Sequence, residues 1–321
     1  MTELEKLCIQ SKDREKLVLR GVEVSDLSPL VGLTNLKVLV LSGCEISDLS
    51  SLAGLESLQE LCLCQNQIED ISPLAGLSNL EILCVQDNQI NDISPLENLL
   101  SLRELVLGRN MVSDISPLNN LTNLQALDLG GNEVYDLSPI SELTDIRQLI
   151  VGSNEIFDLS PIEGLINLDY LCFCHNKVGN FAPLAGLTSL QMLCCMANKT
   201  SEITPLSGLL SLQELHLDGL GITSLYPLID LENLRVLTFR QSGYLDLSVL
   251  SGLTELEELD VAFCEEINGI SGLYELSKLK KFTYSENNIS EEDALELSRF
   301  LPDCVLDVQA LNEEDSYEYD H

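Results

Sequence analysis

The sequence predicts an α/β repeat fold, a solenoid of short coils with a parallel β-sheet on its concave face and 3-10 turns and coil on its convex face. Two observations support this. The 22-residue pattern of residues 71–92, ISPLAGLSNLEILCVQDNQIND, recurs in one register over residues 17–290 of the 321-residue chain. Each copy also carries an alternating apolar segment, which is typical of a half-buried strand. A fixed period of this length indicates stacked repeats and argues against two or three globular domains.

The copies define about twelve repeats and one half repeat. The half repeat is LVLRGVEVSD at 17–26, and the 22-residue period holds up to the copy at Leu247, which has one extra residue. The copies begin at Leu27, Leu49, Ile71, Ile93, Ile115, Leu137, Leu159, Phe181, Ile203, Leu225, Leu247 and Ile270. No single copy can bury its leucines alone, so we expect neighbouring coils to share one core.

Each position within a copy has a physical reason. In NLEILCV, Leu80, Leu83 and Val85 point inward, whereas Ile82 and Cys84 point outward. Each copy opens with a segment such as ISPL, in which proline fixes one φ angle. The segment from Pro73 to Leu80, which leads back to the next strand, is too short for a full α-helix, so a 3-10 turn or irregular coil is expected. Strands packed on one side against slimmer coils on the other make the stack curve with its sheet inside.

An asparagine recurs directly after the strand segment. Its amide offers both donors and an acceptor, so we expect a structural ladder that pairs backbone groups of neighbouring coils inside the bend. The ladder comprises Asn66, Asn88, Asn110, Asn132, Asn154, Asn176 and Asn198. Cys44 and Cys264 occupy the same position and are predicted to be structural, whereas Leu220 and Ser242 interrupt the ladder.

The expected organisation is an N-terminal helical cap at 1–16, the solenoid at 17–290, a helix and strand cap at 291–310 and an acidic tail at 311–321. The N-terminal residues show no secretory signal and no segment is apolar enough to span a membrane, which predicts a cytoplasmic protein. The placement of the eleven cysteines suggests free thiols, in keeping with that compartment. A formal charge of −35 disfavours nucleic acid and anionic membranes and favours a basic protein partner.

The pattern LxxLxLxxNxIxDISPLxxL resembles the short repeats of bacterial internalins and of the leucine-rich-repeat regulatory subunit of protein phosphatase. The closing segment NNISEEDALELSRFLPDC is similar to the C-terminal cap of stand-alone bacterial leucine-rich-repeat proteins. The resemblance implies a right-handed curved solenoid that binds proteins. Unlike a typical internalin, the sequence shows no export signal, immunoglobulin-like region or wall anchor.

The outward strand positions are where binding residues are expected, because the core does not constrain them. An apolar patch comprises Ile150, Tyr170, Cys172, Cys174, Met192, Cys194 and Met196, and an acidic rim comprises Glu214, His216, Asp218, Glu258 and Asp260. Apolar outward side chains of this density are typical of an interface. The residues predicted to bind the partner are Ile150, Tyr170, Cys172, Cys174, Met192, Cys194, Met196, Glu214, His216, Asp218, Arg240 and Asp260.

Two cysteine triangles share one spacing. The first triangle is Cys62, Cys64 and Cys84, and the second triangle is Cys172, Cys174 and Cys194. Either could offer three sulfurs to a soft metal, with His175 or His216 as a fourth ligand near the second triangle. A rigid sheet is instead expected to keep the side chains parallel, so no metal site is assigned. Residues two apart on a strand lie too far apart to bridge, whereas a strained Cys172–Cys194 disulfide is conceivable.

The sequence therefore predicts a monomeric, non-catalytic scaffold without a cofactor that binds a protein, such as an inhibitor or immunity protein covering a basic toxin. One alternative is a secreted effector or adhesin of the internalin type. Another is soft-metal or thiol-redox binding through the cysteine triangles. A hydrolase would need Cys194, His216 and Asp218 together, but an open sheet provides neither an oxyanion hole nor a pocket that excludes water.

Overall fold

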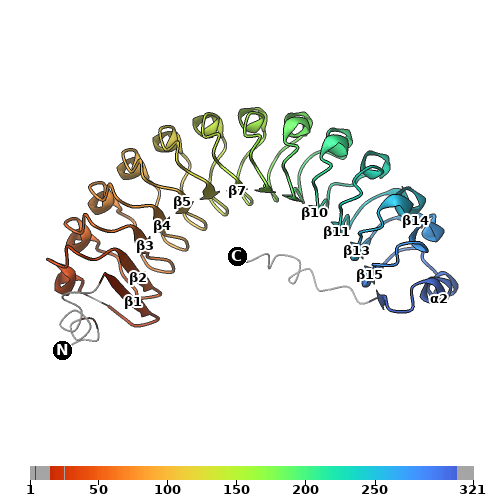
Figure 1. Ribbon diagram of the computed structural model, residues 1–321, viewed down its shortest axis with the longest axis horizontal. Helices are drawn as coiled ribbons and strands as arrows, with labels where there is room; N and C mark the ends of the chain where they lie inside the picture. The colour runs from red at the N-terminus through yellow and green to blue at the C-terminus, as the bar shows by residue number, and fades with distance from the viewer. Residues whose placement is uncertain (1–3, 5–14, 25, 309–321) are drawn as a thin grey trace. The chain divides into compact units, whose positions relative to one another are not determined.

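The computed structural model describes residues 4, 15–24 and 26–308 (Figure 1). The chain divides into two compact units, residues 1–170 and residues 171–321. In each unit the strands lie on one side of the coils and the 3-10 turns on the other (Figure 1). The predicted N-terminal cap at 1–16, apart from its last two residues and residue 4, and the predicted acidic tail at 311–321 lie outside the described residues.

Among its described residues, the first unit contains seven parallel strands that pair in chain order. They are β1 (Lys16–Arg20), β2 (Val38–Ser42), β3 (Glu60–Cys62), β4 (Ile82–Cys84), β5 (Glu104–Val106), β6 (Ala126–Asp128) and β7 (Gln148–Ile150). The 3-10 turns are η1 (Ser28–Leu30), η2 (Ser50–Leu52), η3 (Ser72–Leu74), η4 (Ser94–Leu96), η5 (Ser116–Leu118), η6 (Ser138–Ile140) and η7 (Ser160–Ile162). Strand β8 (Tyr170–Cys172) contains the boundary between the units.

The second unit continues the same plan. Its strands are β9 (Met192–Cys194), β10 (Glu214–His216), β11 (Val236–Thr238), β13 (Glu258–Asp260), β15 (Lys281–Thr283) and β16 (Val305–Asp307), which pair in this order. Its 3-10 turns are η8 (Ala182–Gly186), η9 (Thr204–Gly208), η10 (Tyr226–Leu228), η11 (Leu247–Gly252) and η12 (Ile270–Leu273). The predicted alternation is confirmed in β11, where Leu237 is fully buried between Val236 and Thr238, which are both half-buried.

The asparagine ladder is confirmed in atomic detail. In Asn132 the Oδ1 atom accepts from the backbone N–H of Val112 at 2.9 Å, in the preceding coil. The Nδ2 atom donates to the carbonyl of Leu107 in that coil and to the carbonyl of Leu129 in its own coil, both at 3.0 Å. One side chain thus satisfies backbone groups of two coils and sets their separation. At the same position the Cys264 thiol donates to the carbonyl of Phe239 at 3.4 Å, as predicted for a weak donor.

A second, two-stranded parallel sheet was not foreseen. It pairs β12 (Tyr244–Asp246) with β14 (Glu266–Asn268). Each of these strands begins two residues after a position without a ladder asparagine, Ser242 or Cys264. In this coil Leu245 is buried, whereas Tyr244, at the position of the usual inward residue, is exposed. The buried position has moved by one residue, and the segment extends to pair with the next coil.

Gly269 is the residue that the longer copy requires. Its φ is +69°, and a Cβ atom added there would lie 2.0 Å from Asp246 Oδ1 and 2.7 Å from the backbone nitrogen of Ser248. The Asp246 carboxylate accepts from that same Ser248 nitrogen at 2.9 Å. The absence of a side chain at Gly269 therefore lets the coil approach this capped turn.

The predicted C-terminal helix and strand are present as α2 (Glu291–Phe300) and β16. Ser290 begins the helix with a capping box, in which its hydroxyl accepts from the Asp293 nitrogen and the Asp293 carboxylate accepts from the Ser290 nitrogen. Phe300 stacks on Tyr274 with ring centroids 4.1 Å apart, which attaches the helix to the last repeat.

We expect Asn132→Ala to lower the free energy of unfolding by about 2 kcal/mol or more, because buried backbone groups of two coils lose their partner. Chemical denaturation of both proteins measures the difference. The control is Asn79→Ala, whose exposed side chain makes one bond, to the carbonyl of Glu56. Equal effects of the two substitutions would contradict the ladder's role.

We expect Gly269→Ala to destabilise the protein by about 1–3 kcal/mol from the left-handed backbone alone, with the steric clash adding to it. Gly164→Ala is the control, because nothing lies within 4 Å of its added Cβ atom and its φ is not left-handed. Thermal unfolding of the two variants tests this, and unchanged stability of Gly269→Ala would contradict it.

Candidate functional site

The outward side chains of β8 to β10 form the centre of the predicted binding face in the second unit. The nitrogen of Phe173 donates to the carbonyl of Cys194, and the nitrogen of Cys195 donates to the carbonyl of His216, at 2.9 and 3.0 Å. These bonds place Cys172, Cys194 and His216 side by side on one face.

The expectation that this face exposes its apolar patch is wrong for most of its members. Cys194 is 2% exposed and His216 is 1% exposed, and Cys172, Met192, Met196 and Asp260 are also buried. Outward side chains on neighbouring strands lie only ~4.8 Å apart, so adjacent large side chains leave little room for solvent between them. Cys174, Asp218 and Arg240 are half-buried, and Glu214 is exposed. In the first unit, Ile150 and Tyr170 are half-buried.

Part of the predicted acidic rim is a connected polar network. The Thr238 hydroxyl lies 3.2 Å from His216 Nδ1 and donates to Asp218 Oδ2 at 2.6 Å. The other Asp218 oxygen accepts from the backbone nitrogen of Arg240 at 2.6 Å. The Arg240 guanidinium in turn forms an ion pair with Asp260, with its Nη2 atom 2.6 Å from Oδ2. The sequence places these residues on one face, but which of them pair depends on diagonal contacts between coils.

Burial controls the electrostatics of this network. Desolvation lowers the pKa of His216, which favours the neutral imidazole. Desolvation also raises the pKa of Asp218, against the opposing hydrogen bonds from Thr238 and Arg240. The polar atoms of this network bond to one another, so little of its charge is available to a partner.

The second cysteine triangle converges, contrary to the expectation of parallel side chains. All three sulfurs of Cys172, Cys174 and Cys194 lie within 4.8 Å of one another, and the sulfurs of Cys172 and Cys174 are 3.7 Å apart. A hydrogen bond with Cys172 and burial raise the pKa of Cys174 to about 12, and contacts with Cys172 and Cys174 raise that of Cys194. These thiols are therefore protonated at neutral pH.

The Cys194, His216 and Asp218 set lacks the arrangement of an activated nucleophile. Thr238 stands between the histidine Nδ1 and the aspartate, through the contacts given above. A reactive cysteine needs a lowered pKa and access to solvent, whereas Cys194 has a raised pKa and is buried.

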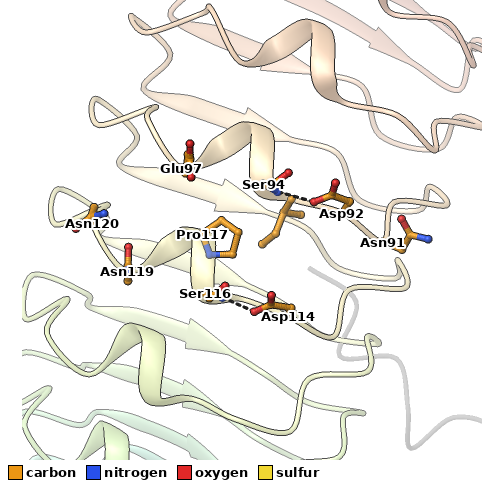
Figure 2. A pocket seen from close by; sticks show the side chains of 10 residues that line it. Asn91, Asp92, Ser94, Glu97, Asp114, Ser116, Pro117, Asn119 and Asn120 are labelled. Atoms are coloured by element: carbon orange, nitrogen blue, oxygen red, sulfur yellow. Dashed lines mark hydrogen bonds between the residues drawn. The ribbon is translucent and has the colours of Figure 1, made fainter.

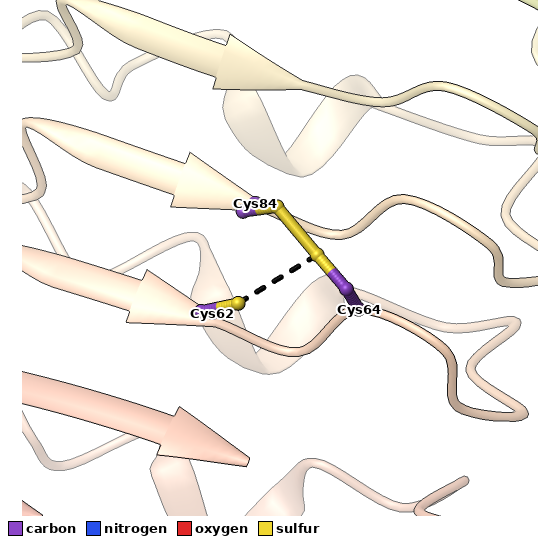
Figure 3. Close-up of side chains that lie close together, drawn as sticks. All are labelled: Cys62, Cys64 and Cys84. Carbon is purple, nitrogen blue, oxygen red and sulfur yellow. Dashed lines mark hydrogen bonds between the residues drawn. A yellow bond between two sulfur atoms is a disulfide. The ribbon is translucent and has the colours of Figure 1, made fainter. Parts of the chain in front are cut away.

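The first cysteine triangle corrects the expectation of free thiols. Cys64 and Cys84 form a disulfide with a Cα–Cα separation of 6.1 Å, and Cys62 lies beside it with its sulfur 3.6 Å from that of Cys64 (Figure 3). The bridge is diagonal, from the second residue after β3 to the end of β4. Pairs along one strand and directly across two strands were considered from the sequence, whereas this diagonal pair was not.

The exposed part of the face lies at the first residue of the strands, a position that we call the first outward column. In this column two glutamates and one aliphatic residue form a stripe, and the stripe occurs once in each unit. In the first unit Glu60 and Glu104 flank Ile82 on adjacent strands. In the second unit Glu214 and Glu258 flank Val236 in the same way. All four glutamates are exposed, and the two aliphatic side chains are half-buried. Of these glutamates the sequence analysis included only Glu214 among the binding residues, although all four appear at one position of the repeat.

A polar hollow lies on the turn side of the first unit, between η4 and η5 (Figure 2). Its residues include Asp92, Ser94, Asp114 and Ser116, and in each Asp–x–Ser turn the carboxylate accepts from the serine nitrogen at 2.8 Å. These hydrogen bonds lower the pKa of Asp114. The carboxylates thus close backbone turns, and we assign no ligand to the hollow.

Comparison with known proteins agrees with this architecture. A family model described as leucine-rich repeats (2 copies) matches residues 56–98 and 100–140. The sequence has no significant match among the curated proteins. None of the helices in the described part of the chain is long and apolar enough to cross a bilayer.

The solved structures that are similar to this chain include two internalins and a further bacterial leucine-rich-repeat protein. An internalin, InlF, from Listeria monocytogenes is 30% identical, with a TM-score of 0.88 over 96% of this chain and 89% of that chain. Internalin C2 from the same organism is 34% identical, with a TM-score of 0.55 over 58% of this chain and 82% of that chain. A leucine-rich-repeat protein from Leptospira interrogans is 23% identical, with a TM-score of 0.73 over 92% of this chain and 90% of that chain.

The Asp–x–Ser turns predict a loss of stability in acid. Hydrogen bonds from the serine backbone lower the folded-state pKa of Asp48, Asp70 and Asp114 below the usual value of an aspartate. The contribution of these carboxylates is therefore present above the unfolded-state pKa and is lost as the pH falls through the folded-state pKa, below about pH 4. We expect Asp48→Asn/Asp70→Asn/Asp114→Asn to lose less stability than the wild type between about pH 6 and pH 3.

Urea denaturation at several pH values measures that difference. Asparagine keeps the turn, since Asn180 Oδ1 accepts from the Ala182 nitrogen at 2.9 Å in the corresponding turn. A control with the same change of charge is Glu56→Gln/Glu142→Gln/Glu163→Gln, at exposed positions. Identical pH dependence in the two triple variants would contradict the role of the turns.

Proposed function

This chain belongs to the leucine-rich-repeat family of the internalin type, and we propose that it acts as a non-catalytic scaffold that binds a basic protein on the sheet face of its coils. The leucine-rich-repeat fold is typically a non-enzymatic scaffold for protein interaction. The basic character of the partner is specific to this chain. It rests on the charge of −35 and on where the exposed carboxylates lie.

The pair of glutamate stripes carries the proposal. In each unit two exposed glutamates on alternate strands flank one aliphatic side chain, Ile82 or Val236. Strands spaced by ~4.8 Å put the two glutamates ~10 Å apart, within reach of two basic side chains on one partner segment. The strands fix their positions before binding, so the partner meets a preorganised acidic surface.

The contact surface differs from the one that the sequence suggests. Met192, Cys194, Met196 and His216 are buried within the unit, so they offer a partner little additional area. We therefore centre the proposed site on the first outward column. Of the residues that the sequence predicts to bind the partner, Glu214 belongs to this column. The half-buried Arg240 and Asp218 lie at the margin of this surface.

We expect Glu214→Gln/Glu258→Gln to weaken partner binding by about fivefold to tenfold at low ionic strength, because each exposed charge pair contributes up to about 1 kcal/mol. The loss should shrink at high salt, which screens exposed charges. The partner is first captured from lysate with the wild type and identified, and its affinity for both proteins is then measured by calorimetry.

The matched control is Glu232→Gln/Glu275→Gln, which makes the same change of charge at exposed positions outside the strands of the same unit. The variant Glu60→Gln/Glu104→Gln tests the stripe of the first unit separately. Equal losses in the control and the stripe variants would reduce the effect to net charge, and unchanged binding in both stripe variants would refute the proposed site.

A second candidate is an exported binding protein of the internalin type, and the Cys64–Cys84 disulfide favours it. Structural disulfides persist mainly in oxidising compartments, whereas the free-thiol argument for the cytoplasm does not hold for these two residues. Fractionation of the source cells, with thiol counting on the isolated protein, separates the two locations. A reduced Cys64 in a cytoplasmic fraction would reject the exported candidate.

A further inference from the structure

The second cysteine triangle has the geometry of a metal site. Cys172 and Cys174 lie at and just after the end of β8, and Cys194 lies at the end of β9. Their spacing of two residues along a strand and one coil across the ladder brings three sulfurs within 4.8 Å of one another. Among the described residues, only this triangle and the first triangle gather three His, Cys, Asp or Glu side chains so closely.

The sulfur separations fit a single bound cation. Metal–sulfur bonds of about 2.3 Å place sulfurs about 4.0 Å apart around a trigonal metal and about 3.8 Å apart around a tetrahedral one. The Cys172 and Cys174 sulfurs are already 3.7 Å apart. Small side-chain rotations therefore suffice to place a metal at the centre, without movement of the strands.

We propose that Cys172, Cys174 and Cys194 bind one Cu(I) ion through their three sulfurs. Thiolate and thioether sulfur favour soft cations such as Cu(I). Structural zinc sites almost always take four ligands from cysteine, histidine and carboxylate. Among the described residues, no histidine, aspartate, glutamate or further cysteine has a ligand atom within 4.8 Å of all three sulfurs. This favours a cation that accepts three ligands.

The surroundings of the triangle also favour a soft cation. Met192, at the start of β9, and Met196, two residues after its end, flank Cys194 in the same coil, and both are buried. Thioethers suit Cu(I) and are not among the usual zinc ligands. His216 is the nearest imidazole along the ladder, but neither of its ring nitrogens lies within 4.8 Å of all three sulfurs. Cys174 is half-buried, which leaves one approach to the site from solvent.

Binding exchanges protons for the metal. Each cysteine that ligates as a thiolate releases one proton, so up to three protons leave when one Cu(I) enters, and the metal keeps its oxidation state. Affinity for Cu(I) should accordingly rise with pH. Buried thiols that hold their protons at neutral pH are slow to react as nucleophiles, but a strongly thiophilic cation displaces those protons.

The first triangle provides an internal comparison. It has the same spacing, but the Cys64–Cys84 disulfide removes two of its sulfurs as ligands (Figure 3). None of Cys172, Cys174 and Cys194 forms a disulfide. An unambiguous test of the second triangle therefore uses a protein in which Cys62, Cys64 and Cys84 are all replaced by serine.

The experiment titrates Cu(I), without oxygen, into that triple-serine protein in competition with a colorimetric Cu(I) chelator. We expect one Cu(I) per chain and a new ultraviolet absorption from thiolate-to-copper charge transfer. Cys174→Ser, which changes the most exposed of the three, should weaken binding by at least about 100-fold, the upper end of losses caused by outer-shell changes. Cys304→Ser, at a half-buried thiol outside the triangle, should bind as tightly as its parent.

A second measurement does not depend on the folding of a variant. In the wild-type protein, under conditions that alkylate Cys174 when no metal is present, Cu(I) should protect Cys174 and leave the labelling of Cys304 unchanged. Failure to retain Cu(I) against the chelator, equal affinity of a folded Cys174→Ser variant, or alkylation of Cys174 unchanged by Cu(I) would each overturn the proposal. Retention of Zn(II) in preference to Cu(I) by native mass spectrometry would overturn the choice of cation.

Discussion

The asparagine ladder of the bends is the interaction on which the rest of the structure depends. A chain that turns every 22 residues leaves buried backbone groups in every bend, and these need partners. Asn110 illustrates the solution, with Oδ1 accepting from Ile90 N at 2.9 Å and Nδ2 donating to the carbonyls of Val85 and Leu107. The residue before it, Arg109, adopts a left-handed φ of 55°, a strained conformation that such over-determined bonding holds in place. Coil spacing, strand register and the outward columns all follow from this bend.

The sequence predicts what the period controls. The strands, the 3-10 turns, the inward leucines and the partners of the asparagines repeat with the coil, so one copy describes them all. The sheet of β12 and β14 is not predictable in this way, because it appears where the period is broken at Leu245 and Gly269. The burial of Cys194 and His216 was missed for a different reason. Alternation says which face a side chain points to, but its exposure depends on the size of its neighbours in adjacent coils.

The net charge of −35 combines carboxylates with different roles. Asp48 and Asp70 accept hydrogen bonds from the serine nitrogen two residues later, so they are part of the backbone turns. Asp260 neutralises Arg240 within a half-buried network. Glu214 and Glu258, by contrast, are exposed on the strands. Composition alone counts all of these as one acidic field, whereas only the last kind can meet a partner without disturbing the fold.

The outward face of the second unit therefore separates lengthwise into two zones with different chemistry. The first column keeps Glu214 and Glu258 in solvent, where charge acts on an approaching partner. The last residues of β8, β9 and β10 are Cys172, Cys194 and His216, and all three are buried. Burial of a charged group there costs free energy, so soft, weakly polar ligands are favoured. A partner that covers the first column would not contact the sulfurs, which lie at the other end of the strands. Protein binding and metal binding can thus occur on one face of the unit without using the same atoms, and substitutions in one zone should leave the other intact.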